Sequence, residues 1–137
     1  MNRATPRLKK FAERLLGYET RAGRAAAASE TATSRVCEKL RRVLSVFLGT
    51  AGFWALLARA VALAKEEAPE LGLVQVQPDG ALDGLADLAD DGQIVKSEVI
   101  LIAHLLGLLV TFVGDALMLR LVQDAWPKAN LDDLNSR

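Results

Sequence analysis

Two long stretches without a charged residue constrain this chain more than any other feature. Residues 43–58 (VLSVFLGTAGFWALLA) and 99–114 (VILIAHLLGLLVTFVG) each contain sixteen residues, and neither includes Asp, Glu, Lys or Arg. Apolar residues recur in both stretches at the three- and four-residue spacing of an α-helix. The chain must therefore cover two highly apolar helices, either with lipid or with other parts of the protein.

A membrane hairpin is one way to cover these helices. Eleven of the seventeen Lys and Arg lie in residues 1–42, and nine of the seventeen Asp and Glu lie between Glu66 and Glu98. Basic residues before the first run, acidic residues between the runs and Arg120 after the second fit the positive-inside distribution. Both ends of such a hairpin would be cytoplasmic, and glycines in both runs would allow the helices to pack closely.

Three features favour the core of a water-soluble protein instead. Both runs are shorter than the roughly 20 residues that a membrane span requires. Extending them brings in Arg59 or Asp115, and one charge near the bilayer centre costs about 2.5–3.5 kcal/mol, which cancels several apolar residues at about 0.3–0.6 kcal/mol each. A helix break at Gly49–Gly52 would also divide the first run into two short pieces. We therefore expect a soluble cytoplasmic protein, with an inner-membrane hairpin as the alternative.

The remaining helices are indicated by spacing and by their ends. Thr5 and Pro6 are typical of a helix start, and apolar residues follow at helical spacing: Leu8, Phe11, Leu15 and Leu16. A second helix begins near Ser34, and its continuation after the predicted break stops at Pro69. The last helix is predicted to run unbroken from about residue 93 to 125.

Residues 70–92 have a different character, because Val74 to Gln77 alternate apolar and polar side chains and Pro78-Asp79-Gly80 favours a turn. The predicted fold class is all-α, a compact bundle of about four helices with a short irregular or extended segment around residues 70–92. We divide the chain into a basic N-terminal helix or arm (1–33), a helical core domain (34–128) and a mobile tail (129–137). The N-terminal region is either a loose arm or a helix that needs a partner.

A line of polar residues follows the last apolar helix, where His104, Thr111 and Asp115 lie at steps of seven and four. Such a line could border a small-molecule pocket or a proton path, but a buried polar seam that fixes helix register is the favoured interpretation. Arg59 is the nearest candidate to pair with Asp115. The predicted structural polar seam therefore consists of Arg59, His104, Thr111 and Asp115.

No motif for catalysis or cofactor binding stands out. Neither G-x-G-x-x-G nor a P-loop occurs, and Ser97, His104 and Asp115 form a triad only on paper, because nothing places Ser97 on a sharp strand-to-helix turn. His104 has no partner at metal-ligand spacing. Cys37 is the only cysteine, so an intrachain disulfide is excluded, and we expect it to be a small buried residue. We predict no enzyme, no cofactor and no metal.

The basic N-terminal region has few interleaved aromatic residues, so a solvated helix face is favoured over nucleic-acid binding. The predicted function is a non-enzymatic helical interaction or scaffold protein that self-associates through its apolar helices as a homo-oligomer, with an unknown protein partner. The alternative is a two-helix membrane-hairpin protein, either an accessory subunit or holin-like.

Three segments carry a resemblance: GFWALLARAVALAKEEAPELG, VQPDGALDGL and LLGLLVTFVGDALMLRLVQDAWPKA. They resemble a set of small, uncharacterised bacterial helical proteins over about residues 36–130. The resemblance implies a soluble helical protein with a helix break at Gly49–Gly52, and it implies no activity and no catalytic residues. The run VLSVFLGTAG is more apolar than the matching segment of those proteins, which keeps the membrane alternative open.

Overall fold

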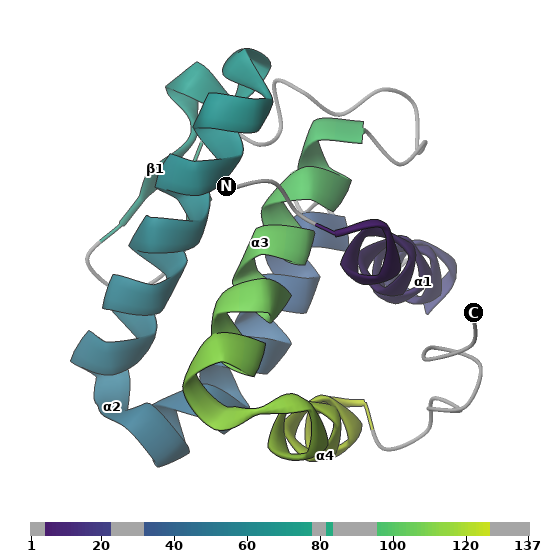
Figure 1. Ribbon diagram of the computed structural model, residues 1–137, viewed down its shortest axis with the longest axis vertical. Coiled ribbons are helices and arrows are strands. Elements are labelled where there is room, and N and C mark those ends of the chain that lie inside the picture. The colour runs from purple at the N-terminus through teal and green to yellow at the C-terminus, as the bar shows by residue number, and fades with distance from the viewer. Residues whose placement is uncertain (1–4, 23–31, 78–81, 84–95, 127–137) are drawn as a thin grey trace.

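The computed structural model describes residues 5–22, 32–77, 82–83 and 96–126 (Figure 1). Four α-helices, one 3-10 helix and a two-stranded antiparallel ladder follow in the order α1 (Pro6–Ala22), α2 (Ala32–Glu67), η1 (Pro69–Leu73), β1 (Gln75–Val76), β2 (Leu82–Asp83), α3 (Lys96–Val113) and α4 (Asp115–Ala125). The predicted all-α bundle with a short extended segment is confirmed. The predicted turn at 78–80, the acidic segment 84–92 and the tail 129–137 lie outside the described residues.

Helix α1 begins as the sequence predicts. The Thr5 hydroxyl accepts a hydrogen bond of 3.2 Å from the backbone N–H of Leu8, which satisfies one of the free N–H groups at a helix start. Phe11, Leu15 and Leu16 are buried against α2 and α3. Of the two alternatives for the N-terminal region, the helix with a partner is therefore the one observed for Pro6–Ala22.

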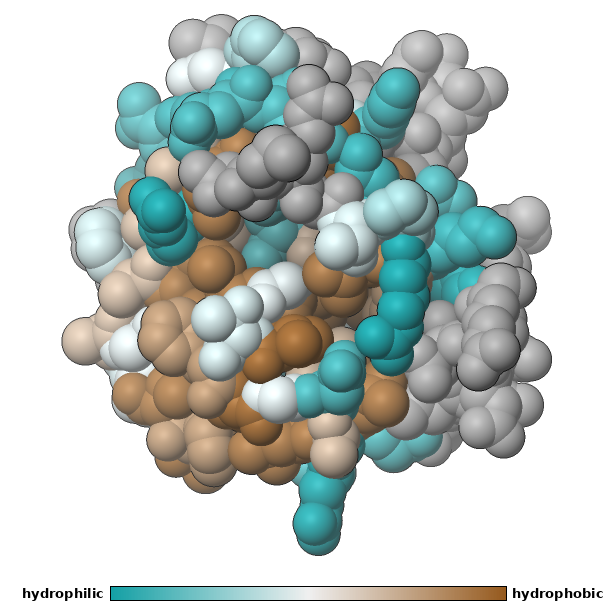
Figure 2. All heavy atoms as spheres, viewed as in Figure 1, coloured by the Kyte–Doolittle hydropathy of each residue, from teal (hydrophilic) through white to brown (hydrophobic). Residues whose placement is uncertain are grey.

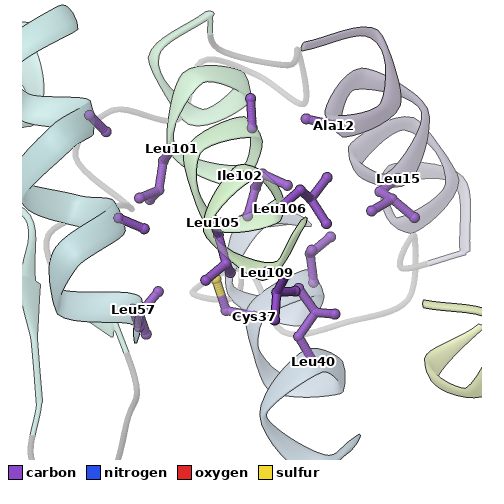
Figure 3. Close-up of a cluster of buried hydrophobic side chains, with 14 of the residues drawn as sticks. Ala12, Leu15, Cys37, Leu40, Leu57, Leu101, Ile102, Leu105, Leu106 and Leu109 are labelled. Carbon is purple, nitrogen blue, oxygen red and sulfur yellow. The ribbon is translucent and has the colours of Figure 1, made fainter. Parts of the chain in front are cut away.

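Helix α3 lies at the centre of the hydrophobic core. Figure 3 shows its side chains pointing to both sides, with Leu101 toward α2 and Leu106 toward Leu15 of α1. Helix α1 approaches α3 closely at Gly107, where an added Cβ would lie 3.2 Å from Leu8 Cδ1. The central position of the most apolar helix is thus explained by packing on two faces.

Helix α2 bends sharply at Gly49, where the backbone has φ 79° and ψ 163°. This conformation is open almost only to glycine, so the predicted break in LGTAG is confirmed. The residues after the bend return along the other side of α3, as the positions of Leu40 and Leu57 show (Figures 1 and 3). One sequence-continuous helix thereby covers two sides of the core.

The prediction of one unbroken helix from 93 to 125 is wrong. Gly114 interrupts it with φ 86° and ψ 164°, nearly the same backbone conformation as Gly49. The N–H of Gly114 still donates to the carbonyl of Val110 at 2.8 Å, and the carbonyl of Gly114 accepts from the N–H of Met118 at 3.0 Å. The glycine therefore ends α3 and begins α4 without an intervening loop.

Candidate functional site

The predicted polar seam separates into one buried residue, His104, and three exposed ones. His104 is buried, and its Nε2 lies 3.0 Å from Glu67 Oε1 at the end of α2. Thr111 is exposed, and its hydroxyl donates a 3.0 Å hydrogen bond to the carbonyl of Gly107. His104 and Thr111 therefore share a helix but not an environment.

Asp115 and Arg59 do not form the predicted buried pair. Both residues are exposed, and the Asp115 carboxylate lies 3.3 Å from the guanidinium of Arg7, with more than half of each side chain in water. Thr111, four residues before Asp115, is already exposed, so this end of the predicted line lies at the surface, and the break at Gly114 then takes Asp115 off the line of His104 and Thr111. The predicted partner of Asp115 on α2 is replaced by one on α1.

Glu67 connects three helices. Its Oε1 contacts His104 of α3, and its Oε2 lies 2.7 Å from the ammonium group of Lys9 on α1. Both Glu67 and Lys9 keep part of their surface in contact with water. This polar link fixes the position of the α2 terminus on the other two helices, and the spacing within one helix could not reveal it.

A second polar cluster surrounds Glu19, a residue that the sequence analysis did not single out. Its side chain is 2% exposed, and its carboxylate contacts the ammonium group of Lys39 and lies 3.3 Å from Arg35 Nε. The indole Nε1 of Trp126 donates a 2.7 Å hydrogen bond to the same carboxylate, and Arg35 Nη2 donates to the backbone carbonyl of Glu19 at 2.9 Å.

Aromatic rings complete this cluster. The Lys39 ammonium lies 5.9 Å from the ring centre of Tyr18 and 5.7 Å from that of Trp126, distances at which a cation is attracted to an aromatic face. One signal for the cluster was present in the sequence. Glu19 follows Leu15 by four residues, so it lies on the buried stripe of α1, where an acid requires a partner.

Cys37 is buried, as the sequence predicts, and lies in the core beside Leu105 (Figure 3). Burial raises the pKa of its thiol to about 12, and the negative charges of Glu98 and Glu38 add to the shift. A thiol in this state is protonated at neutral pH and is a poor nucleophile or metal ligand.

Both polar clusters join different helices. Within the described part of the chain, no three His, Cys, Asp or Glu side chains are grouped so that they could hold a metal ion. The carboxylates of Glu19 and Glu67 are each engaged with side chains from other helices. Their arrangement positions α1, α2, α3 and the end of α4, which is a structural task.

The most unusual surface lies where the helices bend. Four large apolar side chains are exposed in the described residues, and all of them lie near the two glycine corners: Val46 (89% exposed), Phe47 (53%), Trp54 (41%) and Phe112 (70%). We call this surface the apolar end. Figure 1 shows the bend of α2 and the α3–α4 junction at the same end of the molecule, and Figure 2 shows hydrophobic residues gathered over that part of the visible face.

The two corners of the apolar end share a local sequence pattern. Residues 47–51 read FLGTA and residues 112–116 read FVGDA, so an exposed Phe stands two positions before each corner glycine. The backbone angles of Gly49 and Gly114 differ by less than ten degrees. The two corners thus have the same backbone conformation, and each has an exposed aromatic ring two positions before its glycine.

Charged residues lie close to the corners of the apolar end, and Asp115 directly follows Gly114. Within ten residues of the corner glycines along the chain, Lys and Arg outnumber acids by five to two: the cations are Lys39, Arg41, Arg42, Arg59 and Arg120, and the acids are Asp115 and Asp124. Glu38 pairs with Arg41 and Arg42, and the guanidinium of Arg41 is the main reason why the pKa of Glu38 is lowered. The rim of the end is therefore net positive.

By length and composition alone, α2 from Thr33 and α3 are both compatible with membrane association. In the most apolar part of α3, 61% of the residues are buried within the fold. In the most apolar part of α2, only 33% of the residues are buried. The apolar surface that the fold leaves uncovered belongs mainly to α2. Comparison of the chain with protein-family models, with curated proteins and with solved structures finds no match.

Proposed function

We propose that this protein is a non-enzymatic helical interaction protein that works through its apolar end. The observation that carries the proposal is the gathering of the four exposed large apolar side chains at one end of the described structure. Contiguous apolar patches of a few hundred square ångströms on soluble proteins are often functional. A cytoplasmic location, where such a surface would meet partners or the inner membrane, is part of the proposal.

Either of two partners would cover this surface. Self-association, the expectation from the sequence, would bury it against a second copy of the chain. A lipid surface would bury it without any protein partner. A two-helix membrane hairpin is less well supported, because it requires both apolar helices to face lipid, whereas most of the apolar part of α3 is packed against other helices.

The test compares the full chain with the double variant Phe47→Ser/Phe112→Ser in cell fractionation and in sedimentation velocity without detergent. Both rings are exposed, so their loss should leave the fold intact while removing two of the four large side chains of the apolar end. We expect the unmodified chain to associate, with itself or with membranes, and the double variant to be a free monomer. Ala62→Ser is the control, because Ala62 is exposed on α2 thirteen residues beyond Gly49.

A chain that is already a free monomer, in fractionation and in sedimentation, and that is unchanged by the double substitution would contradict the proposal. Circular dichroism of both variants checks the fold. If the double variant fails to fold, Val46→Ser provides a second test, since Val46 is the most exposed member of the apolar end.

A further inference from the structure

We infer that the apolar end docks on the interfacial region of an anionic lipid bilayer, into which the corners at Gly49 and Gly114 insert. This inference rests on the proposed function, because it names the occupant of the same surface. It differs from the membrane hairpin in that no helix crosses the bilayer. Its support comes from the area of the end, from the charge of its rim and from the backbone at its corners.

The apolar area of the end is enough for binding to lipid. Its four side chains expose on the order of 400 Å² of apolar surface, given the size of aromatic residues and their exposed fractions. A stable interface between proteins buries about 800 Å² on each partner, and it needs a complementary polar rim around an apolar part of about this size. A bilayer needs no such complementary area, since aromatic and aliphatic side chains partition individually into the headgroup and acyl boundary.

The charge of the rim also favours lipid. A symmetric dimer formed through this end would bring two net-positive rims together, and the like charges would repel. Anionic lipid headgroups carry the opposite charge and attract arginines that lie near the membrane surface. Arg42, Arg59 and Arg120 are exposed around the end, and their long side chains can reach the headgroups while the apolar parts stay buried.

The backbone at the corners limits how deep the end can insert. A helix terminus leaves several N–H or C=O groups without partners inside the helix. Both backbone groups of Gly114 are paired, but the backbone bends at Gly49 and Gly114, and Gly49, Thr50 and Gly114 are exposed there. Such groups are costly in hydrocarbon, where water is absent, but are satisfied at the level of the headgroups. The corners therefore fit shallow insertion, with Phe47, Phe112 and Trp54 at the depth that aromatic residues prefer.

Binding is tested by flotation of the purified full chain with vesicles of phosphatidylcholine, with and without phosphatidylglycerol. We expect flotation with the anionic vesicles, weaker binding to the neutral ones, and weaker binding as salt is raised. Phe47→Ser and Phe112→Ser should each weaken partitioning about tenfold. Ala62→Ser should bind like the unmodified chain, and Arg59→Gln/Arg120→Gln should reduce the preference for anionic vesicles.

Depth is tested with the fluorescence of Trp54. Lipids brominated near the headgroup should quench it more strongly than lipids brominated near the end of the acyl chain. Trp126 is buried in the protein, so the variant Trp54→Phe should lose the quenching while it still floats with vesicles.

Three outcomes would overturn the inference. The first is absence of vesicle binding together with a dimer that the double variant Phe47→Ser/Phe112→Ser dissociates, which identifies a second copy as the occupant and leaves the proposed function intact. The second is vesicle binding that the same variant does not change. The third is membrane association that resists carbonate extraction with deep quenching of Trp54, which indicates a spanning protein.

Discussion

The indole Nε1 of Trp126 donates a 2.7 Å hydrogen bond to the carboxylate of Glu19, which joins two residues 107 positions apart. Glu19 lies on α1, and Trp126 directly follows α4. Lys39 and Arg35 of α2 contact the same carboxylate. A single buried acid therefore holds three segments of the chain together, and several expectations about stability depend on it.

Removing the charge of Glu19 should destabilise the protein markedly. Glu19→Gln leaves Lys39 and Arg35 facing a neutral amide, and breaking a fully buried ion pair costs about 3–5 kcal/mol. Lys39 and Arg35 keep part of their surface in water, so we expect a loss of about 2–4 kcal/mol in the free energy of unfolding. Urea unfolding measures it, with Glu13→Gln on the exposed face of α1 as the control.

If Glu19→Gln lowers the free energy of unfolding no more than Glu13→Gln does, the cluster around Glu19 makes no net contribution to stability. The fluorescence of Trp126 provides a second readout, because its hydrogen bond to the carboxylate is changed directly. A shift in the emission of Trp126 without a change in the free energy of unfolding would show that the contact with Glu19 exists but does not stabilise the fold.

Replacing either corner glycine should cost stability for a conformational reason alone. A Cβ added at Gly49 or Gly114 would meet no atom within 4 Å, but the backbone angles there are nearly exclusive to glycine. We expect Gly49→Ala and Gly114→Ala each to lower the free energy of unfolding by about 1–3 kcal/mol.

The matched control is Gly72→Ala, which also has open space around its Cβ but has no positive φ. In thermal and urea unfolding, the two corner variants should be clearly less stable than the control variant. Equal stability of all three would mean that α2 and α3–α4 tolerate straightening at the corners.

Cys37 should be inert in the folded protein. Burial raises its pKa from 9.0 to about 12, so the reactive thiolate is about a thousandfold scarcer at neutral pH than in the unfolded chain. Alkylation by N-ethylmaleimide should be slow in buffer and fast in urea. Comparable rates in the two conditions would place the thiol at the surface.

The same shift makes stability depend on alkaline pH. Above pH 9 the unfolded chain loses the Cys37 proton while the folded chain keeps it until about pH 12, so this group's contribution to stability is lost as the pH rises between these values. The slope is about 1.4 kcal/mol per pH unit for one group. Urea unfolding of Cys37→Ala across pH 8–10 should show a shallower decline than the unmodified chain.

Asp115 should matter little for folding. Its ion pair with Arg7 is more than half exposed on both sides, and exposed pairs contribute about 0.2–1 kcal/mol. Asp115→Asn and Arg7→Gln should each change the free energy of unfolding by less than about 1 kcal/mol. A loss of several kcal/mol would instead support the buried role that the sequence suggested.

The sequence predicts the elements of this fold better than their contacts. The break at Gly49 is predicted because two glycines and a threonine interrupt the apolar pattern, whereas Gly114 is missed because apolar spacing continues through it. One glycine inside a helix costs only about 1 kcal/mol, so the sequence pattern alone does not decide whether the helix breaks.

The polar contacts fail for a related reason. The predicted pairing of Arg59 with Asp115 assumed that the helix carrying Asp115 is straight. The break at Gly114 shows that this assumption is wrong. Glu19 and Trp126 are too far apart in sequence for any spacing rule to connect them. His104 belongs to the predicted polar seam, and Glu67 contacts its ring, but only the packing of α2 on α3 could identify this partner.

The contact between Glu19 and Trp126 also sets an order of events during synthesis. Chains grow at about 5–20 residues per second, so Glu19 leaves the ribosome about 5–20 s before Trp126 does. Arg35 and Lys39 follow Glu19 by only 16 and 20 positions, so the pairing of α1 with α2 can form early. The indole then arrives last, and a nascent chain keeps one side of its N-terminal helix open until residue 126 has emerged.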